Sequence, residues 1–417
     1  MSSPPHSSSS PLQIAIVGAG PGGLAAALAL RRSGHHVQIF EASQIKTELG
    51  AGIGLQTNAL RALRALGFGK GNLRGMDYDG IVVFDAKTGT ITPSPLGVQR
   101  HGGELRSVAC HRSDLHDELK RLAMSPEGTG PPVQLHLGNK IVGCDPESGN
   151  LTLANGECIV ADLIIGADGI NSTIRTSILG SPAKPRPSGF SCFRCLFDAS
   201  GLARIPELAW LTDGPLSGPR AITWSEKSFR MFFIYPVRDG SLINFGAFFE
   251  DEPEQENPDG IPIPATREEM LEKYTDAQPK FLRLLDLPIA TPILKWQLRA
   301  VPILPTWIRG RAALLGDAAH GTLPLLGQGV AMAIEDAVVL GALLPSGTTR
   351  EEIPTRLEAY QKLRKERGEF VRTESVEQAA VPAKRGSYAR SRELQEMILE
   401  YDALKAAQDY LGTCSSA

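Results

Sequence analysis

Hydrophobic and polar residues alternate along the chain with two different periods. From Leu12 to Ala42, an apolar strand (IAIV), a glycine-rich turn, an apolar helix and a second strand (HVQIFE) follow one another. This order predicts a βαβ unit and a parallel sheet. Residues 104–178 alternate between strand and helix patterns again, and we expect them to resume the same layer. After Arg311, the strand AALLG and an apolar helix from Gly329 to Leu344 return to the α/β pattern.

A β-rich stretch separates these α/β parts. Between Pro182 and about Trp296, the segments FSCFRCLFD, RAITWS, FRMFFIYPV and SLINFGAFF have the texture of strands. Asp239-Gly240 predicts a hairpin turn between the last two of them. Residues 350–411 show the pattern of amphipathic helices, with breaks at Pro354 and Pro382.

These patterns predict an α/β fold with two lobes. We expect a Rossmann-like nucleotide-binding domain in two parts, a β-sheet substrate domain between them, and C-terminal helices. In chain order, the expected parts are a disordered tail at 1–11, the first Rossmann-like part at 12–180 with a β excursion near 75–105, the β-rich substrate domain at 181–296, the second Rossmann-like part at 297–345 and the C-terminal helices at 346–417.

The bulk composition favours a small-molecule partner. The chain has 417 residues, of which 42% are hydrophobic, and a formal net charge of -3, so it has no basic field for nucleic acid or anionic lipid. No apolar run is long and charge-free enough to cross a bilayer, and the first thirteen residues lack the features of a secretory signal. We therefore expect no nucleic acid, no membrane, and a cytoplasmic monomer or homodimer.

The six cysteines are sparse for this length and suit a reducing compartment. Cys192 and Cys195 form a C-x-x-C, but a redox pair of this kind usually opens a helix, where a thiolate is activated. Their segment alternates like a strand, so we interpret them as strand cysteines and expect no metal site.

A glycine-rich turn carries the first motif with chemical content. In GAGPGG, Gly18, Gly20 and Gly23 follow a strand and precede a helix, and Glu41 ends the next strand, eighteen residues beyond Gly23. The missing side chains let the backbone approach a pyrophosphate, the helix N-terminus offers free N–H groups, and Glu41 can accept hydrogen bonds from ribose hydroxyls. This context predicts a dinucleotide site but does not distinguish FAD from NAD.

A second glycine-rich block favours FAD. Asp317 ends a strand, and the apolar helix that follows is preceded by a turn with Pro324, Gly327, Gln328 and Gly329. Asp317 can accept a hydrogen bond from a ribityl hydroxyl, and the turn would direct a helix N-terminus at a cofactor ring, which favours an anionic reduced flavin. A simple NAD dehydrogenase has no need of such a block.

The third block is DLIIGADGINSTIR, in which Asp168-Gly169 ends a buried strand just before a short helix. On its own this pattern is equally well explained by an ordinary helix cap, with Asn171 and Ser172 at the head of the helix. Its meaning depends on the other two blocks.

Together, in this order and spacing, the three blocks resemble the class A, single-component FAD-dependent monooxygenases, the family of para-hydroxybenzoate and salicylate hydroxylases. Further matches are GAGIGLQTNALRALRALG from Gly50, HRSDL from His111 and YPVRDGSLINFGAF from Tyr235. The last is most similar to salicylate-hydroxylase-type enzymes and to phenol-oxidising enzymes of polyketide pathways. The resemblance covers roughly residues 12–375, with one departure at Gly321, where many relatives have proline.

The resemblance implies the cofactors and their site. The fold would be the GR2-type flavoprotein fold, with FAD as cofactor and NADH or NADPH as co-substrate. Asp168 and Gly169 would lie near the FAD pyrophosphate and support nicotinamide use, and Arg112 would contact the flavin. The full expected cofactor-binding set is Gly18, Gly20, Gly23, Glu41, Ala42, Gly54, Arg112, Asp168, Gly169, Asp317, Pro324, Gly327, Gln328 and Gly329.

The resemblance also implies the reaction. Reduced FAD and dioxygen would form a flavin C4a-hydroperoxide that hydroxylates a small phenolic or salicylate-like substrate, in keeping with secondary metabolism. Arg194 and Tyr235 match positions that bind and polarise the substrate in phenol-oxidising relatives, so we expect them to be catalytic. Two other interpretations stay open, because Arg194 can pair with an acidic neighbour and Tyr235 can be a core ring with one hydrogen bond. His320 is more simply explained as a structural group than as a base.

Other functions on the same scaffold compete with this one. They are an epoxidase acting on an alkene or indole, an oxygen-independent isoprenoid reductase, and a flavin-binding interaction protein with the C-terminal helices as its partner surface. Oxygen consumption with a phenol would separate hydroxylation from these. The sequence leaves open the substrate, the position attacked, the choice between NADH and NADPH, and the oligomeric state.

Overall fold

The computed structural model describes residues 10–44, 51–95, 105–213, 217–224, 228–251 and 260–415. Residues 1–9 of the predicted disordered tail lie outside this set. Among the described helices, none combines the length and the apolar character needed to cross a bilayer.

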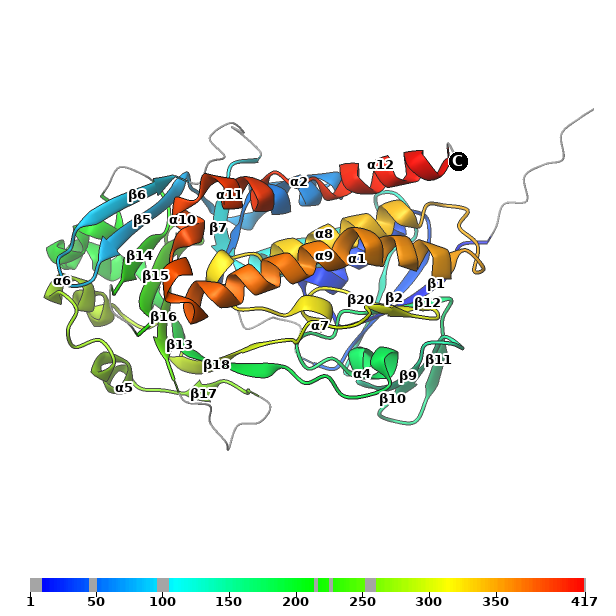
Figure 1. Ribbon diagram of the computed structural model, residues 1–417, viewed down its shortest axis with the longest axis horizontal. Helices are drawn as coiled ribbons and strands as arrows, with labels where there is room; N and C mark the ends of the chain where they lie inside the picture. The colour runs from blue at the N-terminus through cyan, green and yellow to red at the C-terminus, as the bar shows by residue number, and fades with distance from the viewer. Residues whose placement is uncertain are drawn as a thin grey trace, which may run out of the picture.

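A six-stranded sheet forms the centre of the first lobe (Figure 1). β1 (Gln13–Val17) pairs in parallel with β2 (His36–Glu41) and β12 (Leu163–Gly166). Outward from these lie β8 (Gln134–Leu137), β20 (Ala312–Leu314) and the antiparallel edge strand β19 (Ile308–Arg309). Because distant parts of the chain alternate with helices in one parallel sheet, the predicted Rossmann-like α/β fold is confirmed.

Helices with small residues pack tightly in this lobe. α1 (Pro21–Arg32) lies between α3 (Arg112–Met124) and α8 (Gly329–Leu343). A Cβ on Gly341 of α8 would come within 2.8 Å of the Ala29 Cβ of α1, so the glycine permits the close approach of the two helices.

The region 104–178 differs in part from the prediction that it resumes one layer. β8 and β12 join the parallel sheet, but β7 (Val108–His111) pairs with β3 (Gly52–Leu55) and β4 (Met76–Asp77). A separate antiparallel sheet contains β9 (Ile141–Asp145), β10 (Asn150–Leu153) and β11 (Cys158–Val160). These short strands are joined by tight turns and pair with their sequence neighbours, which needs no crossover connection.

The second lobe is built on an eight-stranded sheet. From edge to edge its strands are β17 (Ile263–Pro264), β18 (Leu294–Ala300), β13 (Arg186–Asp198), β16 (Leu242–Glu250), β15 (Arg230–Val237), β14 (Arg220–Thr223), β5 (Gly80–Asp85) and β6 (Ile91–Pro95). β5 and β6 are the expected β excursion and belong to this sheet, and β18 continues past Trp296. The predicted hairpin turn joins β15 to β16, with φ of 56° at Asp239 and 80° at Gly240.

Alternation along the strands gives this sheet two different faces. Phe193, Cys195 and Phe197 of β13 point into an aromatic core that α5 (Arg267–Glu272) and α6 (Pro279–Leu282) cover. Cys192 points to the other face and packs in a different cluster. Cys192 and Cys195 are free thiols on opposite faces, which agrees with their interpretation as strand cysteines.

The C-terminal helices connect the two lobes (Figure 1). α9 (Ile353–Ala380) packs along α8 and reaches β13, and α10 (Ser387–Arg390) contacts β6. α11 (Arg392–Leu399) and α12 (Ala403–Ser415) then return over α2 (Thr57–Ala65). Pro354 lies in the first turn of α9 and Pro382 follows its end, as the predicted breaks require.

A buried cluster of charges joins α8 to α9. Glu335 and Asp336 of α8 are fully buried. Arg364 of α9 lies 2.8 Å from Glu335 and 2.7 Å from Asp336, and Arg367 lies 2.7 Å from Glu335. Burial alone would raise the pKa of Asp336, but His320 and Arg364 lower it to about 2. The carboxylate is therefore charged at neutral pH and needs both partners.

We expect Arg364→Leu to lower the free energy of unfolding by about 3–5 kcal/mol, because it leaves buried carboxylates without their shared cation. Arg356→Leu on the same helix is the control. Arg356 pairs with Glu352 one turn away at a partly exposed site, so its loss should cost about 0.5 kcal/mol or less. Urea unfolding followed by circular dichroism measures both variants, and equal stabilities would contradict this account.

Candidate active site

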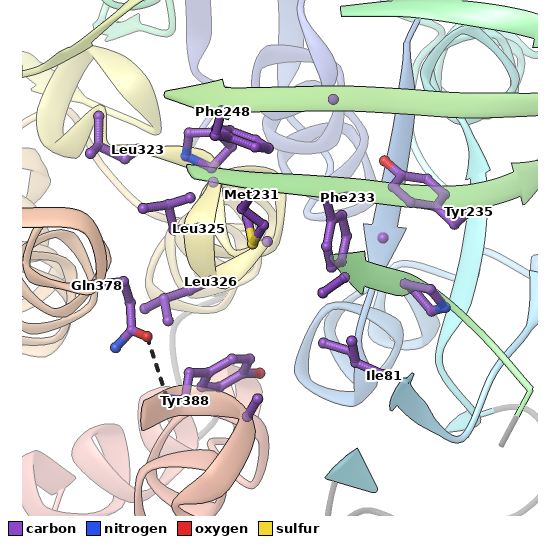
Figure 2. A pocket seen from close by; sticks show the side chains of 18 of the residues that line it. Ile81, Met231, Phe233, Tyr235, Phe248, Leu323, Leu325, Leu326, Gln378 and Tyr388 are labelled. Atoms are coloured by element: carbon purple, nitrogen blue, oxygen red, sulfur yellow. Dashed lines mark hydrogen bonds between the residues drawn. The ribbon is translucent and has the colours of Figure 1, made fainter. Parts of the chain in front are cut away.

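A cavity of about 1600 Å³ lies between the two lobes. Its lining comes from the glycine-rich turns of the first lobe, from one face of the eight-stranded sheet, and from the segment after α9. Figure 2 shows part of it, with Met231, Phe233 and Phe248 of the sheet around the same space as Leu325 and Tyr388. A pocket for one drug-sized ligand has roughly 300–1,000 Å³, so this cavity has room for a dinucleotide and a substrate.

The predicted dinucleotide turn opens onto the cavity at Gly20. Gly18 has a φ of 104°, and a Cβ on Gly23 would lie 2.0 Å from the carbonyl oxygen of Gly18, so these two glycines shape the turn itself. Gly20 lines the cavity, and a Cβ there would meet no atom within 4 Å. Since Gly20 is also the N-cap of α1, free N–H groups and open space coincide, and a pyrophosphate fits there.

Glu41 supports the same turn from the end of β2. Its carboxylate accepts hydrogen bonds from the backbone N–H groups of Ala19 and Ser43, each at 2.8 Å. Each oxygen keeps a lone pair for a ribose hydroxyl. Glu41 and Ala42 are not among the described residues that line the cavity, so their contact with a cofactor stays a prediction.

Asp168 and Gly169 follow β12, and the two residues have different structural roles. The Asp168 carboxylate accepts hydrogen bonds from the Ser172 hydroxyl and from the N–H groups of Thr173 at 2.7 Å and Ile174 at 3.1 Å. It thus caps α4 (Thr173–Leu179), and burial raises its pKa. Gly169, with a φ of 75°, lines the cavity. The alternative of a helix cap therefore holds for the Asp168 side chain, and its role near a pyrophosphate stays a prediction.

Asp317 and the loop before α8 both line the cavity. Pro324, Gly327 and Gly329 line the cavity, as does Asp317 at the start of α7 (Asp317–His320). Because α8 begins at Gly329, its free N–H groups and the positive end of its dipole are directed at this space. Arg112, at the start of α3, lines the cavity as well.

These groups fit a flavin. A carboxylate is available for a ribityl hydroxyl, and a helix N-terminus and a guanidinium are available for an anionic reduced ring. Gly54 of β3 completes this part of the lining. Among the residues that the structure describes, no group of three or more His, Cys, Asp or Glu side chains could hold a metal ion.

Gln328 belongs to the same loop, but it is buried and is not among the described residues that line the cavity. Its side chain donates to the Gln56 Oε1 at 2.7 Å and accepts from the Asn58 Nδ2 at 2.8 Å. Tyr388 of α10 donates to the same Gln56 oxygen at 2.5 Å, and Asn58 also donates to Glu335. Sequence reasoning missed Gln56, Asn58 and Tyr388, because nothing local in the sequence shows that three distant segments meet there.

Arg194 and Tyr235 lie on the side of the cavity that the eight-stranded sheet forms, in the β-rich stretch where the sequence placed them. Arg194 lies opposite Gly246 on β16, and Tyr235 lies opposite Asn244 on the same strand. All four residues line the cavity. Strand alternation places Asn244 on this face together with Tyr235, so the same signal could have identified Asn244 from the sequence.

The electrostatics of this pair suit a phenol. Within the described part of the chain, the Arg194 guanidinium has no hydrogen-bond or ion-pair partner, so the alternative of a pairing with an acidic neighbour is not supported. Burial raises the pKa of Tyr235, and the nearby Arg194 opposes that rise only in part. The phenol of Tyr235 therefore stays protonated and can donate a hydrogen bond. A cation and a neutral donor on one face can together stabilise a phenolate.

His320 lies away from the cavity. Its Nε2 donates to Asp336 at 2.7 Å, and the Gly316 N–H donates to the same carboxylate oxygen at 3.1 Å. His320 is buried against Trp307 and is not among the described lining residues. This placement supports its interpretation as a structural group.

Two family models match the chain. The model described as "FAD binding domain" matches residues 143–375, and the model described as "NAD(P)-binding Rossmann-like domain" matches residues 16–45. The first match includes the Asp168 and Asp317 blocks, and the second includes the dinucleotide turn. Together they agree with a cofactor site assembled from both ends of the chain.

Several known proteins are similar along most of their length. Hispidin-3-hydroxylase of Neonothopanus nambi is 42% identical over 412 residues, which cover 96% of each chain. Salicylate hydroxylase of Pseudomonas putida is 33% identical over 374 residues, which cover 85% of this chain and 82% of the relative. A solved structure titled as a salicylate hydroxylase substrate complex superposes with a TM-score of 0.76, at 29% identity, and covers 96% of this chain and 98% of the other. The chain thus belongs to the FAD-dependent monooxygenases of the salicylate hydroxylase type.

Proposed function

We propose that the protein hydroxylates a small phenol, using FAD, NADH or NADPH, and dioxygen. The observation that carries this proposal is the Arg194 guanidinium, which has no partner among the described residues and shares a face with the protonated Tyr235 in the same cavity as the FAD motifs. The names of two relatives, hispidin-3-hydroxylase and salicylate hydroxylase, describe hydroxylations. Hispidin and salicylate are therefore the first substrates to test.

The residues around the glycine-rich turns would hold the cofactor. In this proposal Gly20 and Gly169 admit the pyrophosphate, Asp317 binds the ribityl chain, and the N-terminus of α8 and Arg112 face the flavin ring. Gly18, Gly23, Glu41 and Asp168 hold the backbone in place for these contacts. Bound FAD would supply the redox chemistry, namely the oxidation of NAD(P)H and the activation of dioxygen.

The chain's own contribution to the chemistry is to bind and ionise the phenol. A guanidinium next to a phenol favours its ionised form, and a charge-assisted hydrogen bond is worth roughly 1.5–3 kcal/mol, or about tenfold to a hundredfold in the phenolate population. Tyr235 donates a second hydrogen bond to the same oxygen. Phe233, Phe248 and Leu325 exclude water from the reacting ring, which protects an activated oxygen species from unproductive decay.

The location and assembly belong to the proposal as well. The cysteines whose side chains the structure describes, from Cys110 to Cys195, are free thiols, and this suits a cytoplasmic protein. Dioxygen and one small aromatic molecule are the proposed reaction partners. We propose a monomer or a homodimer, to be decided by the mass in solution.

We expect Gly20→Leu to abolish FAD binding without unfolding the protein. The backbone at Gly20 is extended, with φ of -65°, and an added side chain would project into open space where the pyrophosphate is placed. Gly69→Leu is the control, because Gly69 is exposed, outside the described lining, and also has no atom within 4 Å of an added Cβ. The number of FAD molecules bound per chain, measured from flavin absorbance, should be near one for the parent and for Gly69→Leu. It should be at least tenfold lower for Gly20→Leu. Full FAD content in Gly20→Leu would place the cofactor elsewhere.

We expect Arg194→Ala and Tyr235→Phe to keep FAD but to uncouple NAD(P)H oxidation from hydroxylation, because both residues contact the substrate and not the cofactor. The product formed per NAD(P)H, with hydrogen peroxide as the remainder, should fall at least tenfold for Arg194→Ala. Arg194→Lys keeps the positive charge and should lose less. If either variant loses FAD, or keeps full coupling with the true substrate, that residue is structural.

A further inference from the structure

The side chain of Gln56 binds the loop of residues 324–328 that precedes α8, which we call the α8 loop. Its Nε2 donates to the backbone carbonyl of Leu326 at 3.3 Å, and its Oε1 accepts from the Gln328 Nε2 at 2.7 Å. A Cβ on Gly327, between these two residues, would lie 3.4 Å from the same Nε2. Gln56 is the N-cap residue of α2, but its side chain makes no cap hydrogen bond. The side chain is thus used to fasten the α8 loop to the start of α2.

A buried anion fixes the direction of the hydrogen bonds in this network. Burial alone would raise the pKa of Glu335, but two arginines of α9 hold it below its usual value, so the group is ionised. A carboxylate can only accept, so the Asn58 Nδ2 donates one hydrogen to it at 2.7 Å and the other to the Gln328 Oε1 at 2.8 Å. Gln328 is left with its Nε2 for Gln56, which must accept through Oε1.

The Gln56 amide is fully used by the protein. Tyr388 of α10 donates to its Oε1 at 2.5 Å, and the Tyr78 hydroxyl shares a hydrogen bond with the same side chain. Burial raises the pKa of both phenols, so they stay protonated near neutral pH. An amide oxygen accepts two hydrogen bonds and an amide nitrogen donates two. Gln56 lines the cavity, but with these four partners it has no hydrogen-bonding capacity left for a ligand.

The position of the α8 loop matters for the cofactor. α8 begins at Gly329, directly after this loop, and Gly329 lines the cavity. The positive field of a helix N-terminus falls off within about one turn. A small displacement of the loop would therefore weaken the attraction between this helix end and an anionic reduced flavin.

We propose that Gln56 is a positioning residue, which holds the α8 loop so that the N-terminus of α8 meets the flavin ring. It makes no hydrogen bond of its own to flavin or substrate. The inference rests on the proposed function, which places the flavin ring at this helix end. Loss of the Gln56 amide should weaken FAD binding and disfavour the reduced form of the bound flavin.

Gln56→Leu removes the amide and keeps a side chain of similar size. The dissociation constant of FAD is measured from the fluorescence released when the FAD-loaded protein is diluted, and it should rise about tenfold or more, because two hydrogen bonds to the loop are lost. The midpoint potential of bound FAD, measured against redox dyes, should become more negative by about 30 mV or more. This shift corresponds to tenfold in the equilibrium constant of a two-electron couple.

Gln56→Glu tests the donor alone. A protonated carboxyl can accept from Gln328 and Tyr388 and donate to Leu326, whereas an ionised one has no donor and repels the Leu326 carbonyl. Burial raises the pKa of a carboxyl, and the neighbouring phenols and Glu335 do not change charge in this range. The dissociation constant of FAD, divided by that of the parent at the same pH, should be near one at about pH 5 and rise about tenfold by about pH 9.

Gln361→Leu and Gln361→Glu are the matched controls. Gln361 of α9 also holds a loop, since its Oε1 accepts from the Trp307 N–H at 2.7 Å and from the Thr306 hydroxyl at 2.8 Å. It lies outside the described lining of the cavity. Both variants should keep the FAD affinity and the potential of the parent at each pH.

Gly329→Asp separates this inference from the proposed function, because it adds a carboxylate at the N-terminus of α8 inside the cavity. If Gly329→Asp makes the potential more negative but Gln56→Leu keeps the affinity and potential of the parent, the positioning role is wrong and the proposed function stands. If Gly329→Asp leaves the potential unchanged, the flavin does not face α8, and the proposed placement fails together with the inference. A Gln56→Glu ratio that is constant from about pH 5 to about pH 9, or equal losses in the Gln361 variants, would overturn the positioning role.

Discussion

The buried carboxylates of Glu335 and Asp336 are the constraint on which the rest of the site depends. Two adjacent charges in the interior of α8 must be neutralised within the protein, since an unpaired buried charge costs several kcal/mol. The groups that do so come from α9, from the turn at Gly316 and, through Asn58, from the start of α2. One cluster therefore fixes α8 relative to the segments that frame the cavity. Through Gln328 and Gln56 the same hydrogen-bond network reaches Tyr388 at the cavity itself.

With α8 fixed, each lobe contributes a different kind of surface. The first lobe offers backbone, in the form of glycine-lined turns and helix N-termini, and backbone N–H groups suit an anionic cofactor. The second lobe offers side chains on one face of a sheet, and strand alternation separates this face from the aromatic core behind it. Arg194 and Tyr235 belong to this second surface. In the proposed function, cofactor binding and substrate binding would thus rest on separate elements, so a substitution in one need not disturb the other.

Sequence reasoning succeeded where the signal is local. The turn at Gly18 to Gly23, the hairpin at Asp239-Gly240 and the strand alternation around Arg194 each depend on a few consecutive residues, and the structure places them as expected. It failed where the outcome depends on partners far away in the chain. The hydrogen bonds that join Gln328 to Gln56 and Asn58, and Gln56 to Tyr388, are decided by tertiary packing that nothing local in the sequence shows. The separate sheet of β9 to β11 forms between sequence neighbours, and the helix cap at Asp168 is one of the two interpretations that the sequence left open. The roles of the individual cofactor-binding residues stay predictions until they are measured.

The central claim is that an arginine and a protonated tyrosine present a phenol to an oxygen-activating flavin. Turnover under ¹⁸O₂ with hispidin or another phenol that accelerates NAD(P)H oxidation tests it most directly, with the product analysed by mass spectrometry. The account predicts that one ¹⁸O atom enters each hydroxylated product and that no product forms without dioxygen. Label that arrives only from H₂¹⁸O, or turnover that continues in the absence of dioxygen, would contradict it and favour a reductase on the same fold.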